Sequence, residues 1–441
     1  MFSERVKCII IFIITFVITL FSVYILTPVF CDEIWAYGFS YNISRGMVIY
    51  RDFNVLQTPL YFFIISWFIK LFGPYMIYMG IFNSILCSCM MVCLYKIGKI
   101  NKFICFLILY VAYPSSYNLF LTFLCFLIIY LIYCKKDNDI IIAFIVSLMF
   151  LTKQNIGIIM FIPCLIYSRN KIKSICTFLV PILILCLYLV CNNALFDFID
   201  YCFLGLFSFN SNNRCIDIFI LFLCFVLCMY LIHRIIKCKF KDKILLYTLC
   251  FCVMSYPVVD FRHFCCCFFI FFCFLDIKLN SYYSYIFLVF KIIYCCCYFF
   301  ALLKNYDVSD ISLDKSNFMF LKNGLNDIEN INLLHEYLDD NNFDYDTDYV
   351  FLGEYYGYFY KLYYNIPIGK YDFIMTGNMG YYNRNKIFSG LDETCKKNIC
   401  YFIIHEVCYL DTDQWHEFAY YIDNKYDKID MEFNKLNIYR S

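Results

Sequence analysis

The sequence predicts an all-α polytopic membrane protein of about eleven transmembrane helices, followed by a small C-terminal α/β domain. Of the 441 residues, 63% are hydrophobic and only 16% are charged. A soluble globular protein is nearer half apolar and a quarter charged, so this composition argues against an ordinary cytosolic enzyme. It also argues against a disordered chain, because 52 Phe and 43 Tyr supply far more apolar surface than disordered chains carry.

Charged residues divide the chain into two parts. Residues 1–303 carry 23 Lys and Arg against 12 Asp and Glu, a net charge of +11, whereas residues 304–441 carry 13 against 23, a net charge of −10. We therefore expect a hydrophobic, mildly basic transmembrane domain over residues 1–303 and an acidic, water-soluble domain over residues 304–441.

Apolar runs that are long enough, or almost long enough, to cross a membrane fill the first part. The run 8–30 follows Arg5 and Lys7, which favours a cytosolic N-terminus, and it lacks the small-residue cleavage site of a signal peptide. Several later runs are short and paired across polar breaks, which suggests one cavity lined by the breaks at 113–116, 152–155 and 256–263. The later runs are 75–95, 103–114, 118–133, 140–151, 156–167, 174–192, 216–232, 244–256, 264–275 and 282–303.

The distribution of Lys and Arg predicts the orientation. With a cytosolic N-terminus, 16 of them fall in cytosolic loops and 6 on the outer side of the membrane part, which is a strong positive-inside bias. A crossing of the membrane by the short apolar segment 59–73 would invert all later loops and remove this bias. We therefore interpret segment 59–73 as a helix in the outer interface, anchored by Trp67 and Lys70. We expect a multi-pass plasma-membrane protein with an extracytoplasmic C-terminal domain.

Residues 304–441 alternate helical and strand patterns. Apolar residues recur at helical spacing from Ile328 to Leu338, and the runs 349–352 and 401–404 are typical of buried strands. Asp411 and Gln414 resemble a capping box that opens a further helix. These patterns predict the small α/β domain.

The 29 cysteines indicate neither a disulfide framework nor a metal site. Most lie in apolar runs, where a thiol behaves as a small apolar group, and no CxxC pair with metal-binding spacing occurs. Only Cys395, Cys400 and Cys408 lie where a disulfide is plausible.

Asp32 and Glu33 are the first candidates for chemistry. Two adjacent carboxylates at the outer end of the first span are costly to desolvate, and their placement suits a general base or a metal ligand facing a polar substrate. The alternative is a solvated helix end, and position alone does not decide between the two.

The loop after this pair favours the catalytic interpretation. It contains Gly46, then Tyr50-Arg51-Asp52, then Thr58-Pro59-Leu60, and leads into an apolar helix that ends at Phe72-Gly73. This pattern resembles the first outer loop of the GT-C membrane glycosyltransferases, particularly the protein O-mannosyltransferase and aminoarabinose transferase branch (glycosyltransferase family 39). The resemblance covers residues 1–303 in architecture and is specific in the outer loop 31–74, where Thr58-Pro59 replaces the double proline of the family.

The resemblance implies transfer of a hexose or pentose from a polyprenyl-phosphate donor to a glycan, lipid or protein acceptor on the outer face. Asp32 matches the family's catalytic carboxylate, which deprotonates the acceptor hydroxyl, and Glu33 matches its partner. The residue types agree with this chemistry, because a hydroxyl that attacks an anomeric carbon needs a base and the departing phosphate needs positive charge.

Lys153, Arg262 and His263 are the candidates for binding the donor phosphate, since all three lie at outer-side breaks. The alternatives are snorkelling of Lys153 to the interface, an ion pair between Arg262 and Asp260, and a helix–helix hydrogen bond of His263. We assign Asp52, Tyr50 and Tyr256 to support of the acceptor or of the loop. The alternatives for Asp52 are that it assists a metal ion or caps a loop.

Members of the family that this loop resembles often carry a second acidic residue in the next outer loop, whereas residues 113–118 here have none. This difference weakens the case for a metal site with two carboxylates, so we expect no required cofactor. A divalent metal ion stays an open alternative. The rival functions are a glycolipid or polyprenyl-phosphate transporter or flippase, which would favour midplane sites and repeated halves, and a non-catalytic surface-binding protein. No nucleic-acid partner is expected, because membrane topology already accounts for the basic loop ends.

Overall fold

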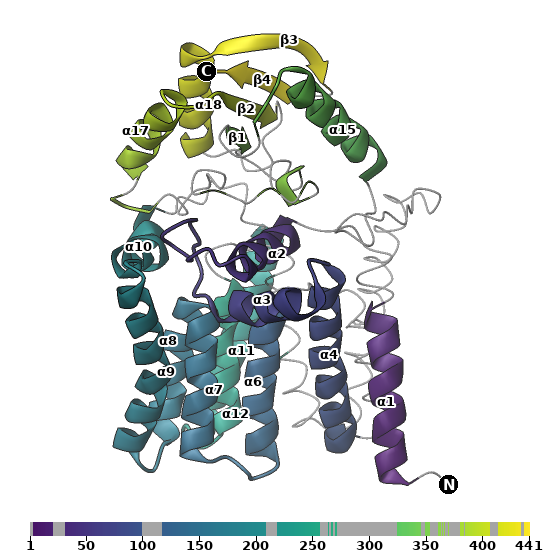
Figure 1. Ribbon diagram of the computed structural model, residues 1–441. Coiled ribbons are helices and arrows are strands. Elements are labelled where there is room, and N and C mark those ends of the chain that lie inside the picture. Colours follow the sequence, from purple (N-terminus) through teal and green to yellow (C-terminus); the bar gives the residue numbers. More distant parts are fainter. Residues whose placement is uncertain are drawn as a thin grey trace. The chain divides into compact units, whose positions relative to one another are not determined.

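A computed structural model of the chain shows a mostly helical protein with a four-stranded sheet near the C-terminus (Figure 1). The mostly helical fold predicted from the sequence is confirmed. The structure describes residues 3–20, 31–98, 117–208, 218–255, 263, 266, 267, 270, 324–344, 349–352, 360–362, 364, 366, 369, 380–382, 384–405, 413–433 and 436–441.

The described residues form two compact units. The first unit comprises those within 1–28, 77–185 and 213–309, and the second those within 29–76, 186–212 and 310–441. The predicted domain boundary at residue 303 lies outside the described residues and stays a prediction.

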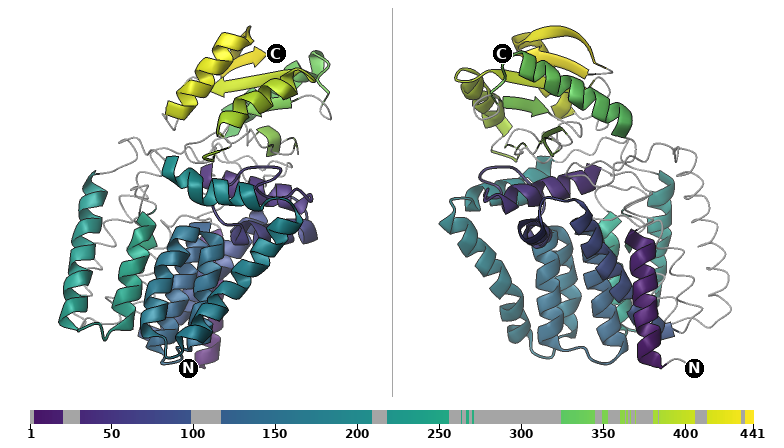
Figure 2. Two further views of the ribbon diagram at one scale, coloured as in Figure 1. Left: turned by 90° about the vertical axis from the view of Figure 1, so that its left-hand side faces the viewer. Right: turned by 45° about the vertical axis from the view of Figure 1, so that its right-hand side comes forward.

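The first unit is a bundle of helices that run side by side (Figures 1 and 2). Helix α4 packs between α1 and α6, α7 packs between α6 and α8, and α12 contacts α6, α8 and α11. The helices are α1 (Glu4–Thr19), α4 (Ile77–Gly98), α6 (Tyr117–Tyr133), α7 (Asp139–Thr152), α8 (Gln154–Tyr167), α9 (Lys171–Cys191), whose end belongs to the second unit, α11 (Ile218–Lys237) and α12 (Lys243–Phe251), which continues as a 3-10 turn (Cys252–Ser255).

Two of the described helices are long and apolar enough to cross a membrane, at residues 77–97 and Lys171–Cys191. Shorter apolar helices occupy Leu60–Phe72, Tyr117–Tyr133, Asp139–Thr152, Gln154–Tyr167 and Lys243–Met254. The apolar runs predicted at 75–95, 118–133, 140–151, 156–167, 174–192, 216–232 and 244–256 are thus confirmed as helices. The total of about eleven spans stays a prediction, because runs 103–114 and 282–303 lie outside the described residues.

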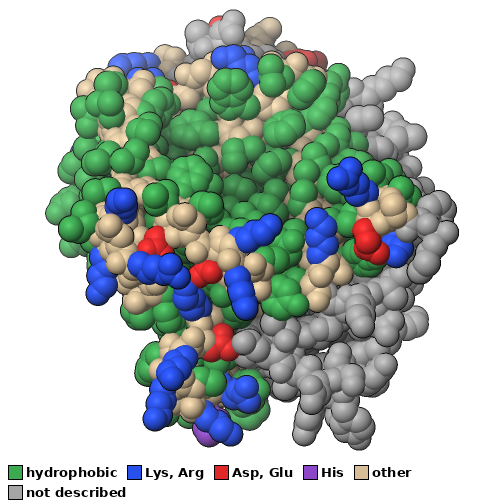
Figure 3. All heavy atoms as spheres, turned by 90° about the horizontal axis from the view of Figure 1, so that it is seen from below, with side chains coloured by type: hydrophobic (Ala, Val, Ile, Leu, Met, Phe, Trp, Pro, Cys, Tyr) green, Lys and Arg blue, Asp and Glu red, His purple; other side chains and the backbone are tan. Residues whose placement is uncertain are grey.

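Basic residues gather at one end of this bundle. The Tyr95 hydroxyl donates to Glu4 Oε2 at 3.2 Å, which joins the end of α4 to the start of α1, and Lys243 pairs with Asp137 between α12 and the α6–α7 loop. Figure 3 shows Lys and Arg outnumbering Asp and Glu on the face that carries these loops. The exposed members are Arg5, Lys96, Lys135, Lys136, Arg169, Lys171, Lys173, Lys237, Lys239 and Lys241, all of which the sequence assigned to one side.

Helices α7 and α8 form a tight hairpin, whose turn lies at the end of the bundle opposite the basic end. A single residue, Lys153, separates them, and its extended backbone (φ −154°, ψ 108°) reverses the chain. Gly157 lets the helices approach closely, because a Cβ atom on it would lie 2.2 Å from the Cα atom of Phe150. The polar break predicted at 152–155 is confirmed.

In the second unit, α2 (Cys31–Ser44) packs against α3 (Leu60–Phe72). Helix α3 follows Pro59 and ends at Gly73, whose φ of 103° suits glycine. One face of α3 is buried through Tyr61, Phe62, Ile65, Ser66 and Ile69, whereas Trp67, Leu71 and Phe72 are exposed. The helix predicted at 59–73 is therefore confirmed, and its place in a membrane interface stays a prediction. The unit also contains α10 (Leu195–Ile199), a π-helical turn (Asp200–Leu204) and a 3-10 turn (Gly205–Ser208).

The C-terminal part combines helices with a mixed sheet. The strand order is β1-β2-β4-β3, with β1 and β2 parallel and the other pairs antiparallel. Helices α17 and α18 pack on the sheet through a core that includes Leu391, Phe402, Phe418 and Ile422. The strands predicted at 349–352 and 401–404 are confirmed. The elements are α15 (Gly324–Asp340), β1 (Tyr349–Leu352), α17 (Arg384–Cys395), β2 (Cys400–His405), α18 (Asp413–Lys425), β3 (Asp427–Phe433) and β4 (Leu436–Arg440).

Candidate functional site

The acidic pair lies at the start of α2 as the structure describes it. Asp32 and Glu33 are the second and third residues of this helix. Glu33 is buried, with only 7% of its surface exposed, while the side chain of Asp32 lies outside what the structure describes. Burial of a carboxylate is costly without compensation, so Glu33 does not fit the alternative of a solvated helix end.

Asp52 holds the loop between α2 and α3. Its Oδ2 atom accepts the backbone N–H of Val48 at 2.7 Å. Its two oxygens also accept from the Arg51 guanidinium, at 2.7 Å from Nε and 2.9 Å from Nη2. The hydrogen bond from Arg51 to this carboxylate raises the pKa of Arg51. These contacts support the loop-capping alternative for Asp52.

Tyr50 is a second support of the same loop. It is fully buried and adopts a φ of 71°, and its N–H donates to the carbonyl of Phe53 at 2.8 Å. Its hydroxyl donates to the carbonyl of Gln57 at 2.8 Å. Burial raises the pKa of Tyr50 well above its ordinary value, so the phenol stays a neutral donor. Of the two roles predicted for Tyr50, the structure therefore favours support of the loop.

The segment after α9 braces this loop from another part of the chain. The ring of Phe198 lies 5.1 Å from the ring of Tyr50, centroid to centroid. The Cys202 thiol donates a long hydrogen bond of 3.7 Å to the carbonyl of Val55. Residues almost 150 positions apart in the sequence thus fix the conformation of the loop that follows the acidic pair.

Asp200, in this bracing segment, is a residue that sequence reasoning missed. It is fully buried, and its Oδ1 atom accepts the backbone N–H groups of Tyr381 at 3.0 Å and Tyr382 at 2.8 Å. Gly380 precedes them with a φ of 70°, and a Cβ atom there would lie 2.2 Å from Asp200 Oδ2. Two carboxylates about one turn apart, Asp197 and Asp200, in a mostly apolar stretch after α9 are the signal that could have identified it.

Replacing Asp200 with Ala should release residues 381 and 382 from this anchor. Each hydrogen bond to a charged acceptor contributes about 1.5–3 kcal/mol, so hydrogen exchange at these two amides should accelerate by at least about tenfold. Hydrogen-exchange mass spectrometry of the full-length protein measures this directly, with Asp197→Ala as the neighbouring control. Equal exchange in the two variants would contradict the anchoring role.

Lys153 is held at the tip of the α7–α8 hairpin. Its ammonium lies 5.8 Å from the ring centroid of Tyr117, the first residue of α6, in a cation–π contact. Such contacts contribute about 0.5–2 kcal/mol, which is enough to orient the side chain. Lys153 as a whole is only partly exposed.

Of the remaining candidate site residues, the structure describes only one. His263 is a described helical residue of intermediate exposure, whereas Arg262 and Tyr256 lie outside the described residues. Asp32, Glu33, Tyr50 and Asp52 belong to the second unit, and Lys153 and His263 to the first. A pocket that joins the acidic and basic groups stays a prediction.

No protein-family model, curated protein or solved structure matches this chain. Within the described ranges, no three His, Cys, Asp or Glu side chains are grouped so that they could hold a metal ion.

Proposed function

We propose that the protein is a plasma-membrane glycosyltransferase that transfers a hexose or pentose from a polyprenyl-phosphate donor to a glycan, lipid or protein acceptor on the outer face. The observation that carries the proposal is the outer loop 31–74. It combines an acidic pair at the start of α2, a loop fixed by Tyr50 and Asp52, and the amphipathic helix α3. Over residues 1–303 the proposal implies a GT-C-like domain of about eleven spans.

The exposed face of α3 suits a place at the lipid head groups. Trp67 and Leu71 are each 67% exposed, and Phe72 is 57% exposed, on a helix whose other face is packed in the protein. Trp at the membrane interface and Lys70 beside it would hold the helix at head-group depth. That is the depth at which a polyprenyl-phosphate donor carries its phosphate.

The arrangement of the basic helix ends supports an outer position for this loop. Helix α1 starts and helix α4 ends at the basic end of the bundle, where Glu4 of α1 accepts a hydrogen bond from Tyr95 of α4. The chain between α1 and α4 therefore departs from the other end of both helices. With the basic end in the cytosol, as the positive-inside rule requires, the N-terminus is cytosolic and the loop is extracytoplasmic.

The proposed reaction is an inverting displacement at the anomeric carbon. Asp32 accepts the proton of the acceptor hydroxyl as its oxygen attacks, and the bond from the anomeric carbon to the phosphate oxygen breaks with its electron pair. Glu33, buried in α2, acts as the partner that positions Asp32. Lys153, Arg262 and His263 stabilise the negative charge that develops on the departing phosphate.

The direct test uses the full-length protein in lipid nanodiscs with radiolabelled polyprenyl-phosphate hexoses and pentoses. Release of the sugar to water, or its transfer to an added acceptor fraction, supports the proposal. Movement of intact donor across proteoliposomes without cleavage would instead identify a flippase. Binding of glycan without either activity would identify a surface-binding protein.

Replacing Lys153 with Ala should raise the donor concentration required for half-maximal activity. A charged contact to phosphate contributes about 1.5–3 kcal/mol, so we expect an increase of at least about tenfold in the apparent KM for the donor. Lys153→Arg should retain most of the affinity, and Lys136→Ala, at the basic end, serves as control. An unchanged donor requirement would refute the phosphate role.

A further inference from the structure

Helix α9 has the length of one membrane crossing and is closed by two polar residues. It begins at Lys171, at the basic end of the bundle, and its 21 residues span about 31 Å, which matches the roughly 30 Å of hydrocarbon in a bilayer. Asn193 follows the helix in the left-handed conformation (φ 55°), and the Asn192 side chain donates to the Tyr188 carbonyl at 2.8 Å. The end of α9 is therefore expected where the lipid head groups begin.

Helix α10 starts directly at this end of α9. The Ala194 N–H donates to the Leu189 carbonyl at 2.8 Å, which folds the chain back onto the last turn of α9, and α10 begins at the next residue. Helix α10 buries Phe198 and exposes Phe196 and Ile199. Its exposed apolar side chains thus lie close to the depth at which aromatic residues are enriched in membrane proteins.

Two tyrosines from the C-terminal part are held beside α10. The N–H groups of Tyr381 and Tyr382 both donate to Asp200, the residue that follows α10. The ring of Tyr382 lies 6.0 Å from the ring of Phe196 and 5.1 Å from the ring of Tyr381, centroid to centroid. All three side chains are more than half exposed. Phe196, Tyr381 and Tyr382 therefore form an exposed aromatic cluster whose backbone is fixed by a buried carboxylate.

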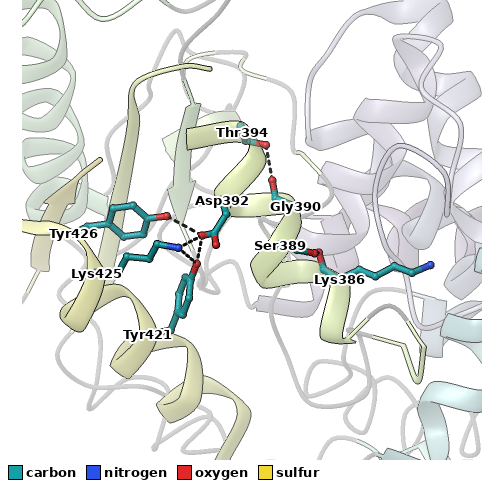
Figure 4. Close-up of polar contacts among 8 residues, drawn as sticks. All are labelled: Lys386, Ser389, Gly390, Asp392, Thr394, Tyr421, Lys425 and Tyr426. Atoms are coloured by element: carbon teal, nitrogen blue, oxygen red, sulfur yellow. Dashed lines mark hydrogen bonds and ion pairs between the residues drawn. The ribbon is translucent and has the colours of Figure 1, made fainter. Parts of the chain in front are cut away.

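The residue types of this cluster suit the surface of a bilayer. A tyrosine ring is apolar and its hydroxyl is polar, so Tyr is favoured where acyl chains meet hydrated head groups. Lys386, in the first turn of α17, is exposed, and Figure 4 shows its side chain directed away from the polar contacts around Asp392. An exposed Lys close to interfacial aromatic rings adds attraction for lipid phosphates.

The aromatic cluster is joined firmly to the rest of the C-terminal part. Helix α17 begins two residues after Tyr382 and packs on the sheet through Leu391. Figure 4 shows Lys425 and Tyr421 of α18 directed toward the carboxylate of Asp392 on α17, with which they form an ion pair and a hydrogen bond. Whatever holds the cluster therefore also holds α17, α18 and the sheet.

We propose that Phe196, Tyr381 and Tyr382 form a membrane anchor, which enters the head-group region of the bilayer around the end of α9 and attaches the C-terminal domain to it. The partner is a phospholipid surface, because the cluster follows directly from a helix of membrane-spanning length. The rings lose contact with water while the tyrosine hydroxyls stay hydrated. The anchor requires that α9 crosses the membrane and does not depend on sugar transfer.

The test measures the depth of the cluster in the full-length protein, reconstituted in phospholipid nanodiscs. Tyr382→Trp adds one indole to the three native Trp residues, so its emission is the difference between variant and wild type. We expect this emission to lie at shorter wavelength than that of an indole in water. It should be largely lost when the phospholipids carry bromine near the top of their acyl chains. Tyr381→Trp should give the same result from the neighbouring ring.

Tyr420→Trp is the matched control, because Tyr420 of α18 is an even more exposed tyrosine outside the cluster. Its added indole should keep its emission in brominated lipid. Indoles at 381 and 382 that emit as in water and keep their emission would overturn the proposal, as would equal quenching at 420. A response to an added acceptor glycan but not to brominated lipid would identify a glycan site instead and would equally overturn the anchor.

Discussion

Replacing Asp32 with Asn is expected to abolish sugar transfer while the protein still inserts into the membrane. Asn has nearly the shape of Asp but cannot accept the proton of the acceptor hydroxyl, and loss of a general base costs typically 10²- to 10⁴-fold in rate. The measurement is the initial rate of transfer from a polyprenyl-phosphate sugar in membranes that contain equal amounts of wild type and variant.

Two controls make this result specific. Asp340→Asn changes an exposed carboxylate of α15 and should leave the rate unchanged. Glu33→Gln alters the buried partner and should lower the rate less than Asp32→Asn does, because it removes a positioning group rather than the base. Retained activity of Asp32→Asn would remove Asp32 from the mechanism.

The orientation can be tested separately from the chemistry. Single cysteines placed at residues 32 and 153 in a background that lacks reactive thiols should both react with an impermeant maleimide added from outside. Labelling from opposite sides of the membrane would rule out one extracytoplasmic site for Asp32 and Lys153.

Local sequence was enough to predict most of the described elements. Polar breaks between apolar runs located the ends of α6, α7 and α8 within a few residues, because a helix in an apolar environment ends where polar groups and Asn caps occur. Pro59 and Gly73 marked the two ends of α3 for the same local reasons.

Contacts between distant segments could not be predicted from the sequence. Nothing near Asp200 indicates that it binds the N–H groups of residues 381 and 382, because that contact depends on how the chain folds back after about 180 residues. The role of Tyr50 was likewise open, since a buried tyrosine in a loop and a substrate-facing one look the same in sequence. The packing of Phe198 against Tyr50 makes that distinction.

Close packing in the α7–α8 hairpin was also invisible in the sequence, where Gly157 is simply one small residue in an apolar run. The structure shows that the space for a side chain is absent, since a Cβ atom would lie 2.2 Å from Phe150 Cα and 2.3 Å from its N atom. Backbone atoms cannot turn away as a flexible side chain can, so the two helices must separate to admit a methyl group.

Replacing Gly157 with Ala should therefore destabilise the hairpin by about 1–3 kcal/mol or more, against the small gain in helix propensity that Ala normally brings. Thermal unfolding of the detergent-solubilised protein should show a lower midpoint for Gly157→Ala than for Ile158→Ala, which truncates an exposed neighbour. Trimming the opposing side chain in Gly157→Ala/Phe150→Ala should not restore the midpoint, because alanine at 150 keeps all three of the closest atoms, the N, Cα and Cβ atoms. Rescue by that second change would show that the contact is between side chains.

The same substitution should also affect donor binding, because Lys153 joins the two helices that Gly157→Ala forces apart. Gly157→Ala and Lys153→Ala should therefore both raise the apparent KM for the donor.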